Sequence, residues 1–241
     1  MEQKRLNKAI SETGFTSRRG ADKLIEEGKV TVNGEVAGLG VKVTSADTIS
    51  VEGKVITKEV KNIYLAFNKP VGITCTTDRE IKGNIVDYIN HPERIFPIGR
   101  LDKPSEGLIF MTNDGDIVNK ILRSKNNHEK EYVVKVNRNI STFFIHEMSN
   151  GVPILDTITK KCKVTKTGDR TFTIVLTQGL NRQIRRMCIY LGYEVQSLKR
   201  VRVMNISLEG IKVGKYRSFT EKELTEILAL VSDSSKTEEA S

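Results

Sequence analysis

The 241-residue chain contains no tryptophan, three histidines and only three cysteines. Cys75, Cys162 and Cys188 are widely spaced without a Cys-x-x-Cys pair, which argues against a disulfide framework and is typical of a reducing compartment. No apolar run approaches the roughly 20 residues that span a bilayer, and the polar N-terminal stretch lacks the apolar core of a signal peptide. We therefore expect a cytoplasmic protein that has no membrane segment.

Metal and cofactor signals are also absent from the sequence. His91, His128 and His146 do not have metal-ligand spacing. The stretch Asn113–Asp116 resembles half a calcium loop, but the spaced ligands and the terminal glutamate of such a loop are missing. No glycine-rich phosphate loop is present. We expect neither a metal nor a cofactor.

Acidic residues are scarce in one region of a chain whose net charge is +9. Residues 1–60 hold ten basic and nine acidic residues, whereas residues 178–202 hold six basic residues and one acidic residue. Clustered cations attract polyanions such as nucleic acid, because neutralised phosphates release condensed counterions. A merely solvated basic face is the alternative interpretation. The low aromatic content of 6% does not favour a base-stacking platform.

Residues 1–60 predict a small first domain of two helices followed by short strands. Apolar residues repeat at helical spacing before Gly14, and Ser17 is a candidate N-cap for a second helix that ends at Gly28. Asn33-Gly34 then gives a strong hairpin signal. We place the boundary of this domain in the mixed polar segment 54–62.

Residues 61–232 predict a second domain in which strands and helices do not alternate strictly. This order favours an α+β fold, with helices packed on a mainly antiparallel sheet. The segment 219–232 is typical of a closing amphipathic helix with Thr220 as its cap. Residues 233–241 are small, polar and charged, so we expect a disordered tail. No spare apolar helix face is evident, and we expect a monomer.

One carboxylate stands on a tight, basic corner in the stretch GRLDKPSEGLIF, residues 99–110. Asp102 lies between Arg100 and Lys103, and Pro104 and Gly107 predict a turn before a buried strand resumes. Neighbouring guanidinium groups favour the ionised form of a carboxylate, and an ionised aspartate is able to act as a nucleophile or a general base. On spacing alone, a structural salt bridge at a loop is the simpler interpretation of the same residues.

A second cluster lies in QGLNRQIRRMCIYLG, residues 178–192, where Ile184 belongs to an apolar helical face. Arg182, Arg185 and Arg186 crowd the start of this helix, and like charges at this spacing repel by a few tenths of a kcal/mol unless an anion lies among them. The pattern indicates phosphate or carboxylate binding, and a solvated basic helix is the alternative. Tyr132 opens a strand in HEKEYVVKV and reads most simply as a half-buried strand residue.

These stretches together resemble one known family over nearly the whole chain. The segment RLNKAISETGFTSRRGADKLIEEGKVTVNGEV resembles the small RNA-binding domain named after ribosomal protein S4. The stretches FNKPVGI, IGRLDKPSEGLIF, KEYVV and GLNRQIRRM resemble the successive motifs of pseudouridine synthases that act on ribosomal RNA. Their spacing is closest to the F type of the enzymes that modify 23S ribosomal RNA.

The resemblance implies an isomerase that converts a uridine of 23S ribosomal RNA to pseudouridine without a cofactor. Asp102 would be the nucleophile, Arg185 would pair with it, and Tyr132 would stack on the uracil and accept the proton from its carbon 5. Ile184 would line the base pocket, and Arg100 would hold the flipped nucleotide or fill the space that it leaves. The motif residues 68–70 would support the fold around the site.

RNA contacts are expected on both domains. Phosphate contacts in the second domain would come from Arg182, Arg186, Lys199, Arg200 and Arg202. The S4-like domain would add Arg5, Arg18, Arg19 and Lys23. Alternatives remain open: the substrate is 16S ribosomal RNA or a tRNA anticodon stem-loop, or the protein is a non-catalytic RNA-binding factor associated with the ribosome.

Overall fold

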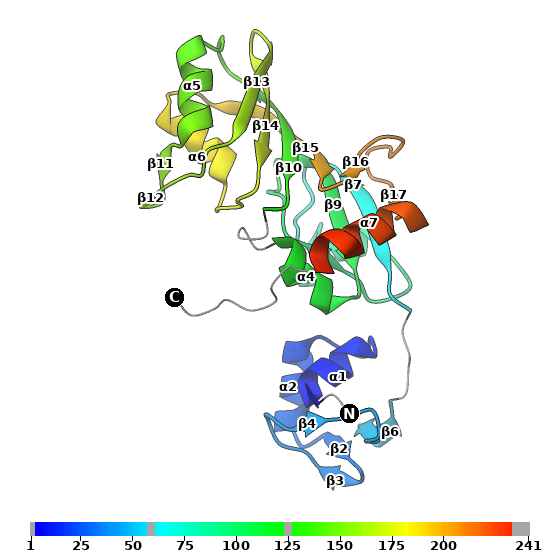
Figure 1. Ribbon diagram of the computed structural model, residues 1–241. Coiled ribbons are helices and arrows are strands. Elements are labelled where there is room, and N and C mark those ends of the chain that lie inside the picture. The colour runs from blue at the N-terminus through cyan, green and yellow to red at the C-terminus, as the bar shows by residue number, and fades with distance from the viewer. Residues whose placement is uncertain (1–2, 57–60, 123–126, 233–241) are drawn as a thin grey trace. The chain divides into compact units, whose positions relative to one another are not determined.

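The computed structural model describes residues 3–56, 61–122 and 127–232, and its chain divides into two units (Figure 1). The first unit comprises residues up to Asn62, to which Pro92–Arg94 are assigned, and the second comprises Ile63–His91 and the chain from Ile95 onward. No helix among the described residues is both long and apolar enough to cross a membrane. The expected tail, residues 233–241, lies outside the described residues.

Two helices and six short strands form the first unit. They are β1 (Lys4–Arg5), α1 (Leu6–Glu12), α2 (Arg18–Glu26), β2 (Val30–Val32), β3 (Glu35–Val36), β4 (Lys42–Val43), β5 (Ile49–Val51) and β6 (Lys54–Val55). The strands β3-β2-β5-β6 make one sheet, and β1 pairs with β4. A small core of aliphatic residues joins both helices to β2, β4 and β5.

Local sequence signals account for the turns of the first unit. Ser17 caps α2 by accepting a hydrogen bond from the Gly20 N–H, and Gly28 follows that helix with a φ of 68°. Asn33 and Gly34 both have positive φ between β2 and β3, as a two-residue hairpin turn requires. The segment in which we place the boundary begins with β6, which pairs with β5, and the first unit ends at Asn62, the last residue of that segment.

The second unit contains the remaining helices and strands. Its helices are α3 (Ile85–Ile89), α4 (Gly115–Leu122), α5 (Thr142–Asn150), α6 (Gln183–Tyr190) and α7 (Glu221–Ser232). Its strands are β7 (Tyr64–Lys69), β8 (Phe96–Ile98), β9 (Glu106–Thr112), β10 (Lys130–Val136), β11 (Pro153–Ile154), β12 (Thr157–Ile158), β13 (Lys163–Gly168), β14 (Thr171–Leu176), β15 (Val195–Val203), β16 (Ile206–Ser207) and β17 (Tyr216–Ser218).

Nine of these strands form one sheet, in the order β13-β14-β10-β15-β9-β7-β17, with β16 on β15 and β8 on β9. Every pair in it is antiparallel except β15 with β9. The predicted α+β fold with a mainly antiparallel sheet is therefore confirmed. Sequence patterns missed α3, β8, the β11–β12 hairpin and β17, because each is too short to display a period.

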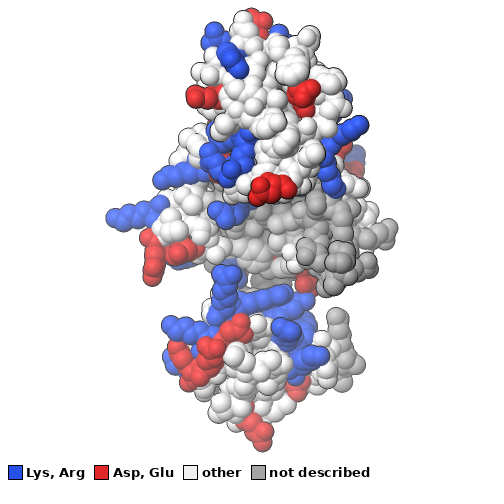
Figure 2. Space-filling view, turned by 90° about the vertical axis from the view of Figure 1, so that its left-hand side faces the viewer, with Lys and Arg blue, Asp and Glu red and all other residues white. Residues whose placement is uncertain are grey.

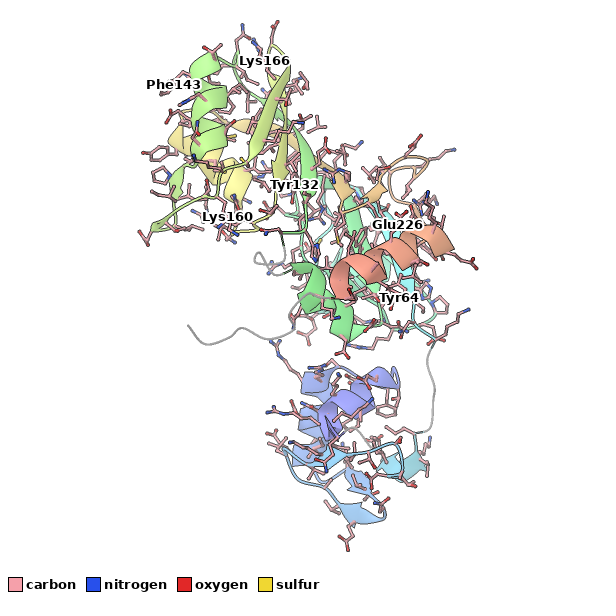
Figure 3. The ribbon with its side chains drawn as sticks, viewed as in Figure 1. Tyr64, Tyr132, Phe143, Lys160, Lys166 and Glu226 are labelled. Atoms are coloured by element: carbon pink, nitrogen blue, oxygen red, sulfur yellow. The ribbon has the colours of Figure 1, made fainter. Side chains whose placement is uncertain are left out.

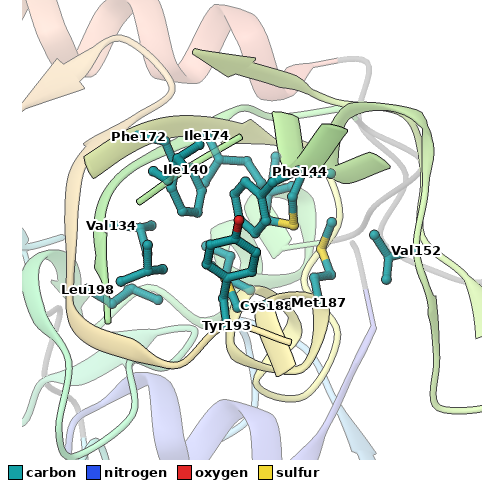
Figure 4. Close-up of a cluster of buried hydrophobic side chains, with 14 of the residues drawn as sticks. Val134, Ile140, Phe144, Val152, Phe172, Ile174, Met187, Cys188, Tyr193 and Leu198 are labelled. Carbon is teal, nitrogen blue, oxygen red and sulfur yellow. The ribbon is translucent and has the colours of Figure 1, made fainter. Parts of the chain in front are cut away.

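Helices cover the sheet unevenly. Alternate residues of β7 and β9 point to opposite faces, so Phe67 and Ile109 pack toward α3, whereas Ala66 and Phe110 pack toward α4 and α7. At the other end, α5 and α6 cover one face of β10, β14 and β15. Figure 4 shows the core there, in which Phe144 of α5 lies among strand residues and the α6 side chains.

The C-terminal helix α7 begins with a reciprocal cap. The Thr220 hydroxyl accepts from the Glu223 N–H at 3.2 Å, and the Glu223 carboxylate accepts from the Thr220 N–H at 2.8 Å. The same carboxylate accepts hydrogen bonds from both terminal nitrogens of Arg217, each at 2.7 Å. The Arg217 guanidinium above all, helped by Thr220, lowers the pKa of Glu223 to about 2. This pair fastens α7 to β17.

We predict that Glu223→Gln destabilises the second unit at pH 7 by about 1.5–3 kcal/mol, the range for a hydrogen bond to a charged group. Because the folded pKa is depressed from 4.5 to about 2, the carboxylate stabilises the fold above pH 4.5 and loses this effect as the pH falls toward 2. The measurement is urea unfolding at pH 7 and at pH 3, with the exposed Glu209→Gln as control. An equal loss of stability at both pH values would contradict the prediction.

Candidate active site

The loop between β8 and β9 carries Asp102 and is held at both ends. The Ser105 N–H donates to the Asp102 carbonyl at 2.9 Å, which closes a turn around Lys103 and Pro104. Before the turn, the Leu101 N–H donates to the Cys75 sulfur at 3.4 Å. These bonds fix the backbone on each side of the carboxylate, whose side chain is one-third exposed.

Asp102 faces two arginines from the start of α6. Its Oδ2 lies 3.6 Å from the Arg185 Nε and 3.5 Å from the Arg182 Nη1. Arg185 is 11% exposed and Arg182 is 45% exposed, so solvent weakens the second pair more. Arg185 also donates through Nη2 to the Ser105 Oγ at 3.0 Å and to the Pro104 carbonyl at 3.3 Å. One guanidinium therefore holds both the nucleophile candidate and its turn.

One nitrogen of the Arg185 side chain lacks a hydrogen-bond partner among the described residues. This nitrogen, Nε, is buried and lies near Asp102. Burial lowers the pKa of Arg185, and the Asp102 charge opposes this shift. A buried donor without an acceptor is costly.

Backbone strain marks the start of α6. Arg182 is the N-cap of this helix and adopts a left-handed conformation, with φ 49° and ψ 34°. Non-glycine residues in this region cost free energy and cluster at functional sites. The conformation coincides with the approach of the Arg182 side chain to Asp102.

Tyr132 occupies the middle of the sheet, on β10 (Figure 3). It lies opposite Ile174 of β14 and Arg200 of β15, next to a register shift between Glu131 and Tyr132. Its ring is partly buried and touches the cores on both halves of the covered face. The Arg200 guanidinium carbon lies 6.0 Å from the ring centroid, within the range of a cation–π contact.

A single pocket gathers six of the predicted residues: Arg100, Asp102, Tyr132, Arg182, Ile184 and Arg185. Its other lining residues were not predicted, and they are Leu101, Ser105, Leu176, Gln178, Gly179, Leu180, Gln183 and Leu198. Ser105 could have been predicted from the sequence, because it lies in the same GRLDKPS motif as Asp102, residues 99–105. Strand residues such as Leu176 and Leu198 could not have been, since only strand pairing brings them to the pocket.

Asn68 and Lys69 of the first motif are buried and do not line this pocket. The Asn68 amide donates to the Ile211 carbonyl at 2.8 Å. The fully buried Lys69 ammonium donates to the carbonyls of Pro70 and Ile73, at 2.9 and 2.8 Å. These bonds tie β7 to the segments on either side of it.

Three further residues that we predicted to contact phosphates interact with other groups of the protein in this structure. Arg186 is exposed but donates to the backbone and side chain of Asn181. The Lys199 ammonium lies 3.6 Å from the Glu106 carboxylate. Arg202 pairs with Glu129 and Glu131, both at 2.9 Å. All three remain at least partly exposed, so a nucleic acid would have to compete with these neighbours.

The expectation of a phosphate contact from Arg200 is corrected by the structure. Arg200 is only 4% exposed, and its Nε donates to the Leu108 carbonyl at 2.6 Å. Its side chain points to the same face of the sheet as Tyr132, because the two residues are directly opposed. The guanidinium therefore offers almost no surface to a phosphate in this structure.

The four cations predicted in the first unit are all exposed. Arg5 precedes α1, and Arg18, Arg19 and Lys23 lie on α2. Lys23 is 3.9 Å from Glu27, an exposed pair of small energetic value. Figure 2 shows Lys and Arg side chains gathered on one side of this unit.

Comparison with known proteins identifies the family. The RNA pseudouridylate synthase model matches residues 63–190, and the S4 domain model matches residues 4–49. The chain belongs to the RNA pseudouridine synthase family. It is 55% identical over 233 residues to the dual-specificity RNA pseudouridine synthase RluF of Salmonella typhi, which covers 96% of this chain and 81% of that protein.

More distant relatives agree. The ribosomal large subunit pseudouridine synthase B of Bacillus subtilis is 37% identical over 235 residues, 94% of this chain and 96% of that one. A solved pseudouridylate synthase superposes with a TM-score of 0.69 at 28% identity, covering 92% of this chain and 99% of the other. The synthase therefore combines an S4 RNA-binding domain with a pseudouridine synthase domain, as its motifs predicted.

We predict that Ser105→Ala lowers kcat/KM for pseudouridine formation by about tenfold, since the lost hydrogen bond to a charged group is worth roughly 1.5–3 kcal/mol and Arg185 becomes less firmly placed. RNA affinity should stay unchanged. The assay is tritium release from RNA labelled at uridine carbon 5. Ser149→Ala is the control, because that hydroxyl bonds within α5 to the Ile145 carbonyl. Wild-type turnover in Ser105→Ala would contradict the prediction.

Proposed function

We propose that the synthase isomerises a specific uridine of 23S ribosomal RNA and that Asp102 is its nucleophile. The observation that carries the proposal is the shared pocket, in which one partly exposed carboxylate faces the Arg185 and Arg182 guanidiniums beside the Tyr132 ring. A carboxylate side chain is one of the groups that act as enzymatic nucleophiles. The ribosomal name of the Bacillus subtilis relative supports a large-subunit RNA substrate.

The isomerisation breaks the bond between ribose C1′ and uracil N1 and forms one between C1′ and C5. The proton at C5 is lost and N1 gains one, so no external reactant is consumed. Asp102 attacks either the anomeric carbon or the base, and both routes keep this balance. Tyr132 stacks on the detached uracil and accepts the C5 proton directly or through water, while Ile184 forms the apolar wall of the pocket.

Arg185 pairs with Asp102 and orients it through the same guanidinium that binds Ser105. When substrate closes the site, a shorter contact between the Arg185 Nε and the carboxylate would satisfy the unpartnered buried donor. This arrangement aims the carboxylate at the ribose and limits its freedom, which is a positioning contribution to catalysis.

RNA binding must supply the free energy to extrude the target uridine, about a few kcal/mol for unstacking and unpairing. Arg182, Arg186, Lys199 and Arg202 border the second unit's basic surface and would contact phosphates there. Arg5, Arg18, Arg19 and Lys23 of the S4 domain would provide a separate anchor. Arg100, which lines the pocket mouth, would contact the extruded nucleotide.

A second RNA substrate is favoured by the name of the Salmonella typhi relative, which describes a dual-specificity enzyme. A tRNA anticodon stem-loop is the second substrate that we propose to test. Both substrates present a stem-loop, and RNA recognition of this kind depends on shape and on dispersed backbone contacts.

We predict that Asp102→Asn abolishes pseudouridine formation, because an amide lacks the charge and nucleophilicity of the carboxylate. RNA affinity should change by less than about threefold, since binding relies on phosphate contacts elsewhere. Tritium release and RNA binding by filter retention measure the two quantities. Asp169→Asn is a control on an exposed loop. Normal turnover by Asp102→Asn would refute the nucleophile assignment.

The substrate is tested by mapping pseudouridines in 23S ribosomal RNA, 16S ribosomal RNA and tRNA from a strain that lacks the gene. Loss of a 23S site that reappears with the wild-type gene, but not with Asp102→Asn, is the expected result. Loss confined to another RNA would transfer the proposal to that substrate. An unchanged map, with intact RNA binding, would support a non-catalytic factor.

A further inference from the structure

Arg200 lies where two strands meet the same edge of β9. Lys199 and Arg200 of β15 pair with Glu106 and Gly107, the first two residues of β9. From Phe110 onward that edge pairs with β8 instead, because β7 occupies the whole opposite edge. The carbonyl of Leu108 lies between the two pairings, and the Arg200 Nε donates to it at 2.6 Å.

These two strands carry the two halves of the catalytic site. The chain leaves β8 directly into the loop of Asp102, whereas β15 pairs along β10 and places Arg200 opposite Tyr132. The Arg200 side chain thus bonds to the backbone at the junction of both halves and lies 6.0 Å from the Tyr132 ring centroid. Among the described residues, no other side chain makes both contacts.

The burial of Arg200 needs an explanation. It is 4% exposed and forms no ion pair with a carboxylate of the described residues. Removing an unpaired guanidinium from water costs several kcal/mol, although hydrogen bonds and ring contacts recover part of this. Burial and the Arg200 charge together lower the pKa of the neighbouring Lys130 to about 8. The contacts of Arg200 must therefore offset the cost of its burial.

The backbone around Arg200 is also tightly constrained. Gly107 has a φ of 113°, and a Cβ built on it would lie 2.6 Å from the Arg200 nitrogen. A side chain at position 107 would push β15 away from β9. The glycine permits the close approach of the Arg200 backbone to β9.

We propose that Arg200 is a positioning residue that holds the Tyr132 ring in place relative to Asp102. The proposal rests on the roles given to Tyr132 and Asp102 above. The Arg200 guanidinium faces the Tyr132 ring and also donates to the Leu108 carbonyl at the junction of β8, β9 and β15. These two contacts would keep the position of the ring fixed relative to the loop that carries Asp102. It does not contact RNA.

The test compares Arg200→Met and Arg200→Lys in the full-length enzyme, by tritium release and by RNA affinity. We expect Arg200→Met to lower kcat about 100-fold, the cost of a displacement near 1 Å in an active site, while the Kd for RNA stays within about twofold. Arg200→Lys should recover about tenfold, because an ammonium restores the charge and one hydrogen bond but not the planar contact. Arg138→Met, which removes a cation–π contact with Tyr193 outside the pocket, is the matched control and should leave kcat unchanged.

A double-mutant cycle separates positioning from general stability. If Arg200 acts through the Tyr132 ring, Arg200→Lys should cost less than about threefold in a Tyr132→Leu background, which removes the ring, because coupled residues are not additive. Equal costs in both backgrounds would overturn the proposal. So would a raised Kd with a reduced salt dependence and unchanged kcat, which is the signature of a phosphate contact.

Different experimental results would contradict the proposed function and the inference about Arg200. A wild-type enzyme that releases no tritium from any of the three RNA classes would contradict the proposed function. An active wild type, a dead Asp102→Asn and an unimpaired Arg200→Lys would refute the inference about Arg200 alone. If Arg200→Met does not fold, the lysine variant and the cycle still decide the matter.

Discussion

The parallel pairing of β9 with β15 is the constraint on which the catalytic unit depends. It joins two antiparallel groups of strands through two residue pairs, whose members lie about ninety positions apart in the chain. A side chain on Gly107 would not fit there, because its Cβ would collide with the Arg200 backbone. Asp102 lies in the loop before β9, and Tyr132 lies on β10, which pairs with β15. The pocket that both residues line therefore depends on the pairing of β9 with β15.

Charge distribution in the pocket follows from the same geometry. Three arginines crowd the start of α6 in sequence, and their repulsion is relieved in different ways. Arg182 and Arg185 turn to Asp102, whereas Arg186 bonds to Asn181. The anion implied by the crowded arginines is thus, for two of them, a carboxylate of the protein itself. A single carboxylate between two cations retains attraction for an additional anion, which is consistent with the proposed entry of an RNA nucleotide.

Much of the fold could be predicted, because long strands and amphipathic helices have clear periods. The Ser17 cap, the Asn33-Gly34 turn and the N-terminal cap of α7 at Thr220 depend only on neighbouring residues, and the structure contains all three. Short elements such as α3 and β8 were missed, since five residues or fewer cannot display a period. Arg200 was misinterpreted for a different reason: alternation along β15 indicates that it faces away from Lys199, but not which face is covered.

By itself the sequence determined the family, the domain order, and the residue types available for chemistry, because motifs and caps are local patterns. Tertiary structure decided which of the basic residues serve the pocket. It placed Asp102 within 3.6 Å of Arg185, buried Arg200 beneath Tyr132, and brought Ser105 to the guanidinium. These contacts join residues some 70 to 80 positions apart in the chain. Their geometry follows from strand pairing and packing across the whole sheet, to which no short stretch of sequence has access.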